Sequence, residues 1–350
     1  MIKVLAIDDS AVVRRGIERL LSGQPDIQLV GTAPDPFVGR NKIVALDPDV
    51  VLLDLEMPRM DGITFLRKLM QSRPMPVIVL SSITQGNSRA LLEALSAGAF
   101  DVVSKPRSAH TLEEVAEQLI ERIRAAKSAR VNAGAKAKKA QTTPVSPATL
   151  GDFENSHQLL VIGASTGGTR ALEVVLEGLP RQCPAVMVTQ HMPAEFTRSF
   201  AERLNQLSEL RVKEAEHGDL LTCGMMVIAP GNRHMELERS GALYRVSIHD
   251  GERVNRHRPS VDVMFNSVAK HAGANAVGAI LTGMGDDGAR GLLAMRKAGA
   301  ATIAQDQASS VVYGMPKAAV ALGAAAIVCP LDQVAQQMLR CAQSIRAKVG

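Results

Sequence analysis

A serine in the second half of the chain has the sequence surroundings of an enzyme nucleophile. Ser165 lies within Gly163-Ala164-Ser165-Thr166-Gly167-Gly168, at the end of the apolar run 159–163. A strand followed by such a small-residue turn and a helix exposes the hydroxyl at the carboxyl edge of a sheet. Gly-rich turns also bind phosphates, so this motif alone fits a nucleotide site about equally well. The missing P-loop lysine and the absence of a dinucleotide-binding spacing favour the nucleophile.

A serine hydroxyl needs a general base, and one histidine is placed to supply it. His191 follows the apolar run 185–189 and so stands at another predicted carboxyl strand end, unlike the other seven histidines. His234 and His257 remain unassigned from the sequence. The histidines interpreted as structural or surface residues are His110, His157, His217, His249 and His271.

The base in turn needs an orienting acid, and two adjacent aspartates follow a third apolar run, 276–281. The chemistry does not choose between Asp286 and Asp287, and either could instead cap the helix expected to begin near Gly288. The glycine-rich loop before them could present backbone N–H groups to a developing oxyanion. The residues expected to line this oxyanion and substrate loop are Thr166, Met284 and Gly285.

A second set of polar residues ends the apolar runs of the first half: Asp8, Asp9, Asp54, Ser81 and Lys105. Carboxyl ends of parallel strands converge on one crevice, where three carboxylates would repel unless a hard cation such as Mg²⁺ neutralised them. Asp54 is then placed as nucleophile toward a phosphoryl group, with Ser81 on its oxygens and Lys105 as compensating charge. A single acid here would more simply be a helix cap, but the whole set favours a phosphorylation pocket.

Two successive α/β patterns would position these two sets of residues. Short β-branched runs alternate with amphipathic segments from Lys3 to Ala126, which predicts a parallel sheet with helices on both faces. A second alternation begins at Leu159. It becomes strand-rich between Leu210 and Ile248, where Ser240-Gly241 is typical of the turn of an antiparallel hairpin.

Length and composition agree with a two-domain globular protein. The 350 residues exceed the usual single core, and much of the net charge of +5 lies in one Ala-, Lys- and Pro-containing segment that cannot bury a core. The predicted parts are a domain at 1–126, a flexible basic linker at 127–156 and a domain at 157–350. The four cysteines are scattered without paired spacing, which predicts a cytoplasmic protein. No apolar run is long enough to cross a bilayer, which predicts that the protein is not membrane-inserted.

The first domain resembles the response-regulator receiver family. The resemblance rests on the run from Asp54 to Gly62 (DLEMPRMDG) together with Lys105-Pro106, and it covers about the first 125 residues. It implies phosphorylation of Asp54 by a chemotaxis histidine kinase, with Mg²⁺ held by Asp9, Asp54 and the Glu56 backbone carbonyl, and with Asp8 acting through water. Many receivers have an aromatic switch residue where this chain has Val102.

The second domain resembles the protein-glutamate methylesterases of bacterial chemotaxis over about residues 159–340. The motifs are GASTGG at 163–168, QHMP at 190–193, APGNRHM at 229–235, RPSVDVMF at 258–265 and LTGMGDDGA at 281–289. The family pattern places the triad acid directly before Gly-Ala, which implies Asp287. The fold class expected is α/β, with a flavodoxin-like (βα)₅ receiver and a Rossmann-like, doubly wound, mostly parallel sheet carrying an inserted antiparallel hairpin.

The resemblance implies a phosphorylation-activated hydrolase. It would demethylate glutamate methyl esters and deamidate glutamines on methyl-accepting chemotaxis receptors, with no cofactor for the hydrolase. A phosphorylation-switched protein that binds receptors or the kinase without turnover is the alternative. A DNA-binding regulator is disfavoured, since the basic linker is followed by no helix-turn-helix and the 3% aromatic content argues against stacking on bases, so no specific nucleic acid is expected.

Overall fold

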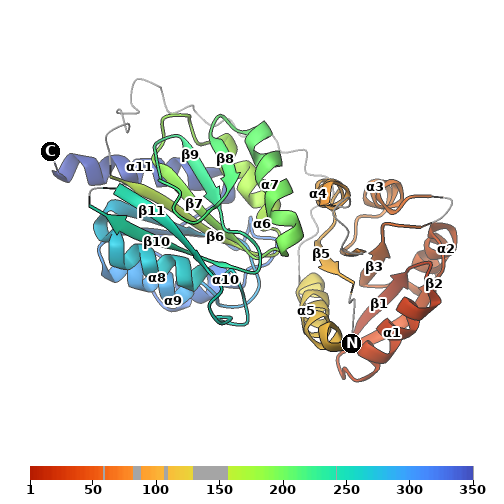
Figure 1. The fold of residues 1–350 in the computed structure, drawn as a ribbon. Helices are drawn as coiled ribbons and strands as arrows, with labels where there is room; N and C mark the ends of the chain where they lie inside the picture. The colour runs from red at the N-terminus through yellow and green to blue at the C-terminus, as the bar shows by residue number, and fades with distance from the viewer. Residues whose placement is uncertain (58–59, 82–87, 106–108, 129–156, 242, 350) are drawn as a thin grey trace. The chain divides into compact units, whose positions relative to one another are not determined.

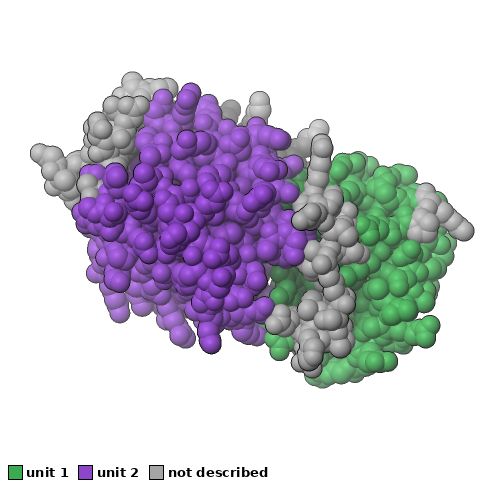
Figure 2. Space-filling model, in the orientation of Figure 1, with its two compact units in different colours: residues 1–138 green, residues 139–350 purple. Residues whose placement is uncertain are grey.

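The computed structural model describes residues 1–57, 60–81, 88–105, 109–128, 157–241 and 243–349. These residues fall into two compact units, one from Met1 to Lys138 and one from Lys139 to Gly350 (Figure 2). Most of the predicted linker 127–156 lies outside the described residues. Its first two residues form the end of a helix that runs to Ser128.

The first unit contains a parallel sheet in the strand order β2-β1-β3-β4-β5 (Figure 1). Consecutive β-branched and leucine residues make the central strands β3 and β4 fully buried, as expected for strands covered on both faces. The strands are β1 Ile2–Ile7, β2 Ile27–Ala33, β3 Val50–Asp54, β4 Val77–Ser81 and β5 Asp101–Ser104. The helices are α1 Ala11–Ser22, α2 Pro36–Leu46, α3 Gly62–Ser72, α4 Ser88–Ser96 and α5 Ala109–Ser128.

The second unit contains a larger parallel sheet in the order β14-β13-β12-β6-β7-β9-β8, beside the separate antiparallel pair β10-β11. The chain proceeds from β6 toward β7 on one side and later fills the other side from β12. The sheet strands are β6 Leu159–Ala164, β7 Ala185–Gln190, β8 Arg211–Glu214, β9 Met225–Ile228, β12 Ala276–Ile280, β13 Ala301–Gln305 and β14 Ile327–Cys329. The switch in strand order at β6 is the position where open α/β sheets bind ligands.

The predicted hairpin is present and packs on a helix. Strands β10 His234–Ser240 and β11 Leu243–His249 pair in register on either side of Gly241, which has φ 64°. The hairpin contacts α8, Val261–His271, which in turn packs on α9, Ala289–Lys297 (Figure 1). Buried side chains of the hairpin, the two helices and the sheet form one hydrophobic core.

Four further α-helices lie in the described part of the second unit, and one of them, α10, packs on α9. Helix α11 contacts α6, and α6 contacts α7, so these three form a second group. The bounds are α6 Gly168–Glu177, α7 Ala194–Leu207, α10 Met315–Ala321 and α11 Leu331–Val349. Within the described ranges no helix is both long enough and apolar enough to cross a bilayer.

Helix α7 allows a matched test of how burial stabilises the second unit. The side chain of Leu204 is fully buried, whereas Leu207, one turn later, is 52% exposed. We expect Leu204→Ala to cost about 2–5 kcal/mol of unfolding free energy, because it leaves a cavity. Leu207→Ala should cost about 0.5 kcal/mol or less. Differential scanning calorimetry measures both, and equal shifts of the melting temperature would contradict this packing.

Candidate active site

Ser165 lies on the tight turn between β6 and α6. Its backbone N–H donates to the Thr282 carbonyl at 3.0 Å, and its own carbonyl accepts from the N–H of Gly168 at 2.7 Å. Gly167, with φ 77°, begins the helix without a side-chain cap. These backbone bonds fix the turn, and the side chain of Ser165 is left 8% exposed at the carboxyl end of the strand.

The close approach of three chain segments explains why glycine is needed around this serine. A Cβ at Gly283 would lie 2.2 Å from the Met315 sulfur and 2.8 Å from the Ser165 Cβ. A Cβ at Gly168 would lie 2.1 Å from the Gln190 Oε1. The loop after β12 can therefore approach the serine, and the start of α6 can pack on Gln190, only because these positions lack a side chain.

His191 follows β7, whose last residue pairs with the last residue of β6. The backbone N–H of His191 donates to the Ala164 carbonyl at 3.1 Å. The amide nitrogen of Gln190 donates to the carbonyls of both Ser165 and His191, at 2.9 and 3.1 Å. One buried amide thus links the backbone of the serine to the backbone of the histidine.

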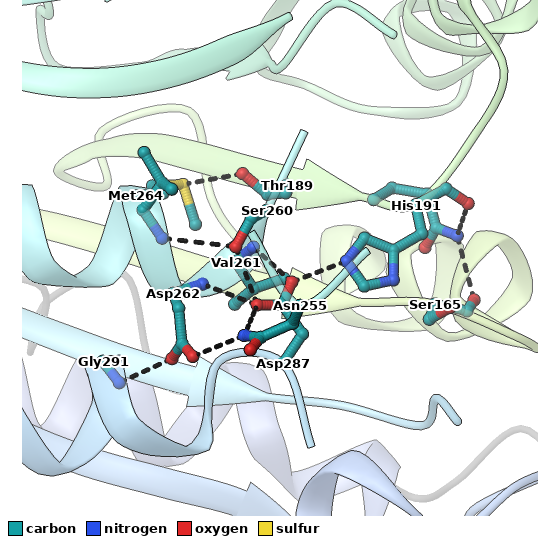
Figure 3. A network of polar contacts seen from close by, with 12 residues as sticks. Ser165, Thr189, His191, Asn255, Ser260, Val261, Asp262, Met264, Asp287 and Gly291 are labelled. Carbon is teal, nitrogen blue, oxygen red and sulfur yellow. Dashed lines mark hydrogen bonds and ion pairs between the residues drawn. The ribbon is translucent and has the colours of Figure 1, made fainter. Parts of the chain in front are cut away.

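The imidazole of His191 is hydrogen-bonded through Nε2 to Oδ2 of Asp287 at 2.8 Å. Its other nitrogen, Nδ1, is buried and has no hydrogen-bond partner within the described parts of the chain. In Figure 3 the ring lies between Asp287 and Ser165. Nδ1 is therefore the nitrogen available to a proton from the serine side.

Asp287 lies at the N-terminus of α8, where its carboxylate accepts two backbone N–H groups. Val261 donates to Oδ2 at 2.7 Å, and Asp262 donates to Oδ1 at 3.2 Å. The hydroxyl of Ser260 and the amide of Asn255 also donate to Oδ1, at 2.7 and 2.8 Å. The carboxylate thus binds the positive end of a helix that is not the next one in the chain.

This network keeps Asp287 ionised. Burial alone would raise the pKa of Asp287, but the hydrogen bond and charge of His191, followed by the bonds from Asn255 and Ser260, hold that pKa well below its usual range. The neighbouring Asp286 is exposed, and its backbone carbonyl accepts the N–H of Ala289. Asp287 is therefore the acid at the imidazole, and neither acid caps α9 with its side chain.

Of the residues predicted for the oxyanion and substrate loop, Thr166 directly follows the serine, and Met284 and Gly285 follow Gly283, where an added Cβ would contact Ser165. Thr166 is buried, and its carbonyl accepts the hydroxyl of Thr282 at 3.0 Å. Met284 is half-buried and Gly285, with φ 82°, is exposed. Their role toward an oxyanion stays a prediction.

The polar set of the first unit meets at the carboxyl ends of β1 and β3. The Lys105 Nζ lies 2.7 Å from Asp8 Oδ2 and 2.8 Å from Asp54 Oδ2. Carboxylate oxygens of Asp8, Asp9 and Asp54 all lie within 4.8 Å of one another. Apart from the lysine contact, Asp8 Oδ2 has no hydrogen-bond partner in the described chain. These closely spaced oxygens, one of them short of partners, fit a hard divalent cation.

Burial and neighbouring charges shift the pKa values of Asp54 and Lys105 in this pocket. Burial raises the pKa of Asp54, and together with the charge of Asp8 it outweighs the hydrogen bond and charge of Lys105, which lower that pKa. Burial by itself would lower the pKa of Lys105, but its bonds to Asp54 and Asp8 outweigh that effect and raise it. Lys105 is therefore held as a cation beside the carboxylates.

The remaining predicted residues of the pocket lie nearby. Ser81 is buried at the end of β4, and its carbonyl accepts the N–H of Lys105 at 2.7 Å. The backbone N–H of Glu56 donates to Asp54 Oδ1 at 3.1 Å, which places Glu56 directly beside Asp54. The Glu56 carbonyl as a metal ligand stays a prediction. Val102 is buried in β5.

Comparison with known proteins finds a match for each half of the chain. A family model described as CheB methylesterase matches residues 160–338, and one described as the response regulator receiver domain matches residues 4–117. A protein-glutamate methylesterase/protein-glutamine glutaminase of Salmonella typhi is 54% identical over 342 residues, covering 97% of this chain and 96% of its own length.

The chain belongs to the CheB methylesterase family.

Relatives outside Salmonella are equally similar. The protein-glutamate methylesterase/protein-glutamine glutaminase 4 of Anaeromyxobacter dehalogenans is 54% identical over 341 residues, covering 97% of this chain and 95% of its own length. The crystal structure of the Thermotoga maritima CheB methylesterase catalytic domain matches with a TM-score of 0.52 and 37% identity, covering 53% of this chain and 98% of that one. The two-domain α/β organisation predicted from the sequence is thereby confirmed.

Sequence reasoning missed the residues that hold the acid of this CheB family member. Asn255 and Ser260 bind Asp287, and His234 accepts the N–H of Ser260 at 3.3 Å while its Nε2 bonds the Glu252 carbonyl. Ser260 before an apolar helical pattern was a readable N-cap signal. Nothing in the local pattern shows that an acid from a distant loop would share that cap. His234 is a buried structural histidine whose pKa burial lowers.

The pKa of Asp287 predicts how stability depends on pH. Its folded pKa lies below the unfolded value of about 3.9, so its stabilising contribution is complete above that pH and is lost as pH falls through the folded pKa. We expect Asp287→Asn to lower the melting temperature at neutral pH, and the difference from wild type to shrink below about pH 4. Differential scanning calorimetry of wild type and variant, from neutral pH to below about pH 4, measures this difference in melting temperature. The exposed Asp286→Asn is the control, and an equal loss there would contradict the assignment.

Proposed function

We propose that this chain is a phosphorylation-activated hydrolase that removes methyl groups from glutamate methyl esters on methyl-accepting chemotaxis receptors and deamidates glutamines there. The observation that carries the proposal is the buried pair of His191 and Asp287 at the strand end next to Ser165. The names of the relatives, protein-glutamate methylesterase/protein-glutamine glutaminase, support the substrate and both reactions.

In the proposed reaction the Ser165 hydroxyl attacks the γ-carbonyl carbon of the ester. Since Nε2 of His191 is bonded to Asp287, Nδ1 takes the serine proton. The ionised Asp287 stabilises the resulting imidazolium. This assignment requires a small movement that brings the hydroxyl within hydrogen-bond reach of Nδ1, as is common when substrate enters an active site.

The tetrahedral intermediate then collapses and the C–O bond to the methoxy group breaks. The imidazolium of His191 protonates the leaving methoxy oxygen, so methanol departs and the γ-carbonyl stays esterified to Ser165. Water, deprotonated by His191, hydrolyses this ester and regenerates the serine, leaving a glutamate. With a glutamine the same sequence releases ammonia.

Backbone donors of the Thr166 turn and the Met284–Gly285 loop are the proposed oxyanion site. Gly285 has a left-handed φ of 82°, and a Cβ built there would meet no atom within 4 Å, so the loop is open to a ligand at this position, which supports that role. One such donor typically contributes on the order of 10²–10³-fold in rate. The hydrolase site uses only this chain's own residues and needs no cofactor in this proposal.

The first unit is proposed to control the second through phosphorylation of Asp54. A chemotaxis histidine kinase is the phosphodonor, Lys105 binds a phosphoryl oxygen and Ser81 donates to another. Mg²⁺, held by Asp9, Asp54 and the Glu56 carbonyl, would supply positive charge to the carboxylates and the incoming phosphoryl group. A change of about 1.4 kcal/mol in the free-energy difference between inhibited and active states changes their population ratio tenfold. A contribution of that size from phosphorylation is enough for a tenfold activation.

The proposal includes a cytoplasmic location beside the receptors, with residues 1–126 as receiver, 127–156 as flexible linker and 157–350 as the catalytic domain. The alternative, a phosphorylation-switched protein that binds receptors or kinase without turnover, would not need an acid held ionised at a buried imidazole. That pairing favours the hydrolase.

Methanol release from membranes that carry methylated chemoreceptors tests the proposed function. We expect acetyl phosphate to stimulate release by wild type, and Ser165→Ala to abolish release with or without it. Asp54→Asn should retain basal release and lose the stimulation, because it keeps the hydrolase but not the phosphoacceptor. Wild-type protein that binds these membranes without releasing methanol would support the binding alternative instead.

The acidic pocket predicts a matched pair of charge variants. Asp9→Asn should weaken Mg²⁺ binding by at least ~10-fold. Losses of this size occur even when the substituted residue only hydrogen-bonds to a metal ligand. Asp26→Asn removes the same charge directly before the amino end of β2, where Asp26 pairs with Arg124, and should leave Mg²⁺ affinity unchanged. Isothermal titration calorimetry measures both. Equal affinities for the two variants would show that the cation binds elsewhere.

A further inference from the structure

A short turn in front of α8 contacts both the imidazole and the carboxylate of the catalytic pair. Val254 and His257 form an isolated antiparallel bridge, with N–H···O distances of 3.1 and 2.9 Å. The residues between them, Asn255 and Arg256, have φ angles of 50° and 68°. Two successive left-handed residues define a tight hairpin turn, which suits Asn but is unfavourable for Arg. A left-handed conformation at a residue other than glycine costs free energy, so it occurs where the surrounding structure enforces it, often at functional sites.

The first turn residue binds two carboxylates with one amide group. Asn255 Nδ2 lies 2.8 Å from Oδ2 of Asp262 and 2.8 Å from Oδ1 of Asp287 (Figure 3). Its two N–H bonds are enough to serve one carboxylate each. Asp262 also accepts the N–H of Gly291 at 2.6 Å, so its position is fixed from the side of α9. Asn255 therefore joins Asp287 to a carboxylate that is itself held in place.

The last turn residue covers one face of the base. The rings of His257 and His191 are stacked, with centroids 3.7 Å apart and planes 13° from parallel. A single hydrogen bond to Asp287 leaves the His191 ring able to rock about that contact. A second ring against its face removes that freedom. The orientation of Nδ1 toward Ser165 then depends on both contacts, and misplacement by about 1 Å can cost on the order of 10²-fold in rate.

We infer that the turn 254–257 is a positioning element of the hydrolase site. Asn255 fixes the carboxylate of Asp287, and His257 fixes the ring plane of His191. Neither residue touches the ester, and both act through the catalytic pair. The inference rests on the proposed function, so its test needs one measurement that does not depend on turnover.

Two substitutions of His257 separate stacking from imidazole chemistry, because phenylalanine keeps a ring and removes both nitrogens. In the full-length, phosphodonor-activated protein with methylated receptor membranes, we expect His257→Ala to lower kcat on the order of tenfold while KM changes less than about twofold. His257→Phe should retain most of kcat. Asn255→Ala should lower kcat by roughly 10–100-fold. His271→Ala, at the far end of α8, is the histidine control and should match wild type.

Nitrogen-15 NMR of labelled histidines reports the same positioning without turnover. We expect a slowly exchanging Nε2–H proton of His191 in wild type, assigned by its loss in His191→Gln. His257→Ala and Asn255→Ala should broaden or remove it, whereas His257→Phe keeps it.

Unchanged kcat and an unchanged resonance in both alanine variants would overturn the inference. Loss of kcat in His257→Phe equal to that in His257→Ala, with the resonance intact, would also overturn it by assigning the effect to the nitrogens of His257. A wild type that releases no methanol, while the resonance still depends on residues 255 and 257, would refute the proposed esterase and leave the positioning role standing.

Discussion

The carboxylate of Asp287 on the N-terminus of α8 is the contact on which the arrangement of the hydrolase site depends. It accepts the backbone N–H groups of Val261 and Asp262 while it binds the imidazole of His191. A loop that follows β12 is thereby tied to a helix that precedes β12, and both are tied to the strand end that carries the base. Losing this carboxylate would leave the N–H groups at the start of a helix unsatisfied and would remove the hydrogen-bond partner of the His191 imidazole.

Both units gather polar side chains at the carboxyl ends of parallel strands, but the pKa of the central carboxylate is raised in one unit and lowered in the other. Strand ends at the switch in strand order gather polar side chains in each. In the first unit three carboxylates lie close together, one lysine pairs with two of them, and burial raises the pKa of Asp54, which suits the proposed uptake of a cation. In the second unit one carboxylate receives five donors and stays ionised, which suits an acid that must remain an anion while its histidine gains a proton.

The sequence was informative where side-chain chemistry coincides with a strand end. The placement of Ser165, His191 and Asp54 follows from a buried run that stops at a polar residue, because parallel strands align their carboxyl ends. The choice of Asp287 over Asp286 needed the family pattern, since two adjacent acids differ only in the direction each side chain takes. The stack of His257 on His191 and the amide of Asn255 on Asp287 join segments far apart in the chain. No local periodicity encodes such contacts.

The most direct test of the account is to trap the ester between enzyme and substrate. Activated full-length protein is mixed with methylated receptor membranes, quenched in acid within the first turnovers, digested and analysed by mass spectrometry. We expect a peptide in which Ser165 is esterified to a receptor glutamate. This peptide should be absent with Ser165→Ala and with unmethylated, non-amidated receptor. Undiminished methanol release by Ser165→Ala, or an ester on another residue, would contradict Ser165 as the nucleophile.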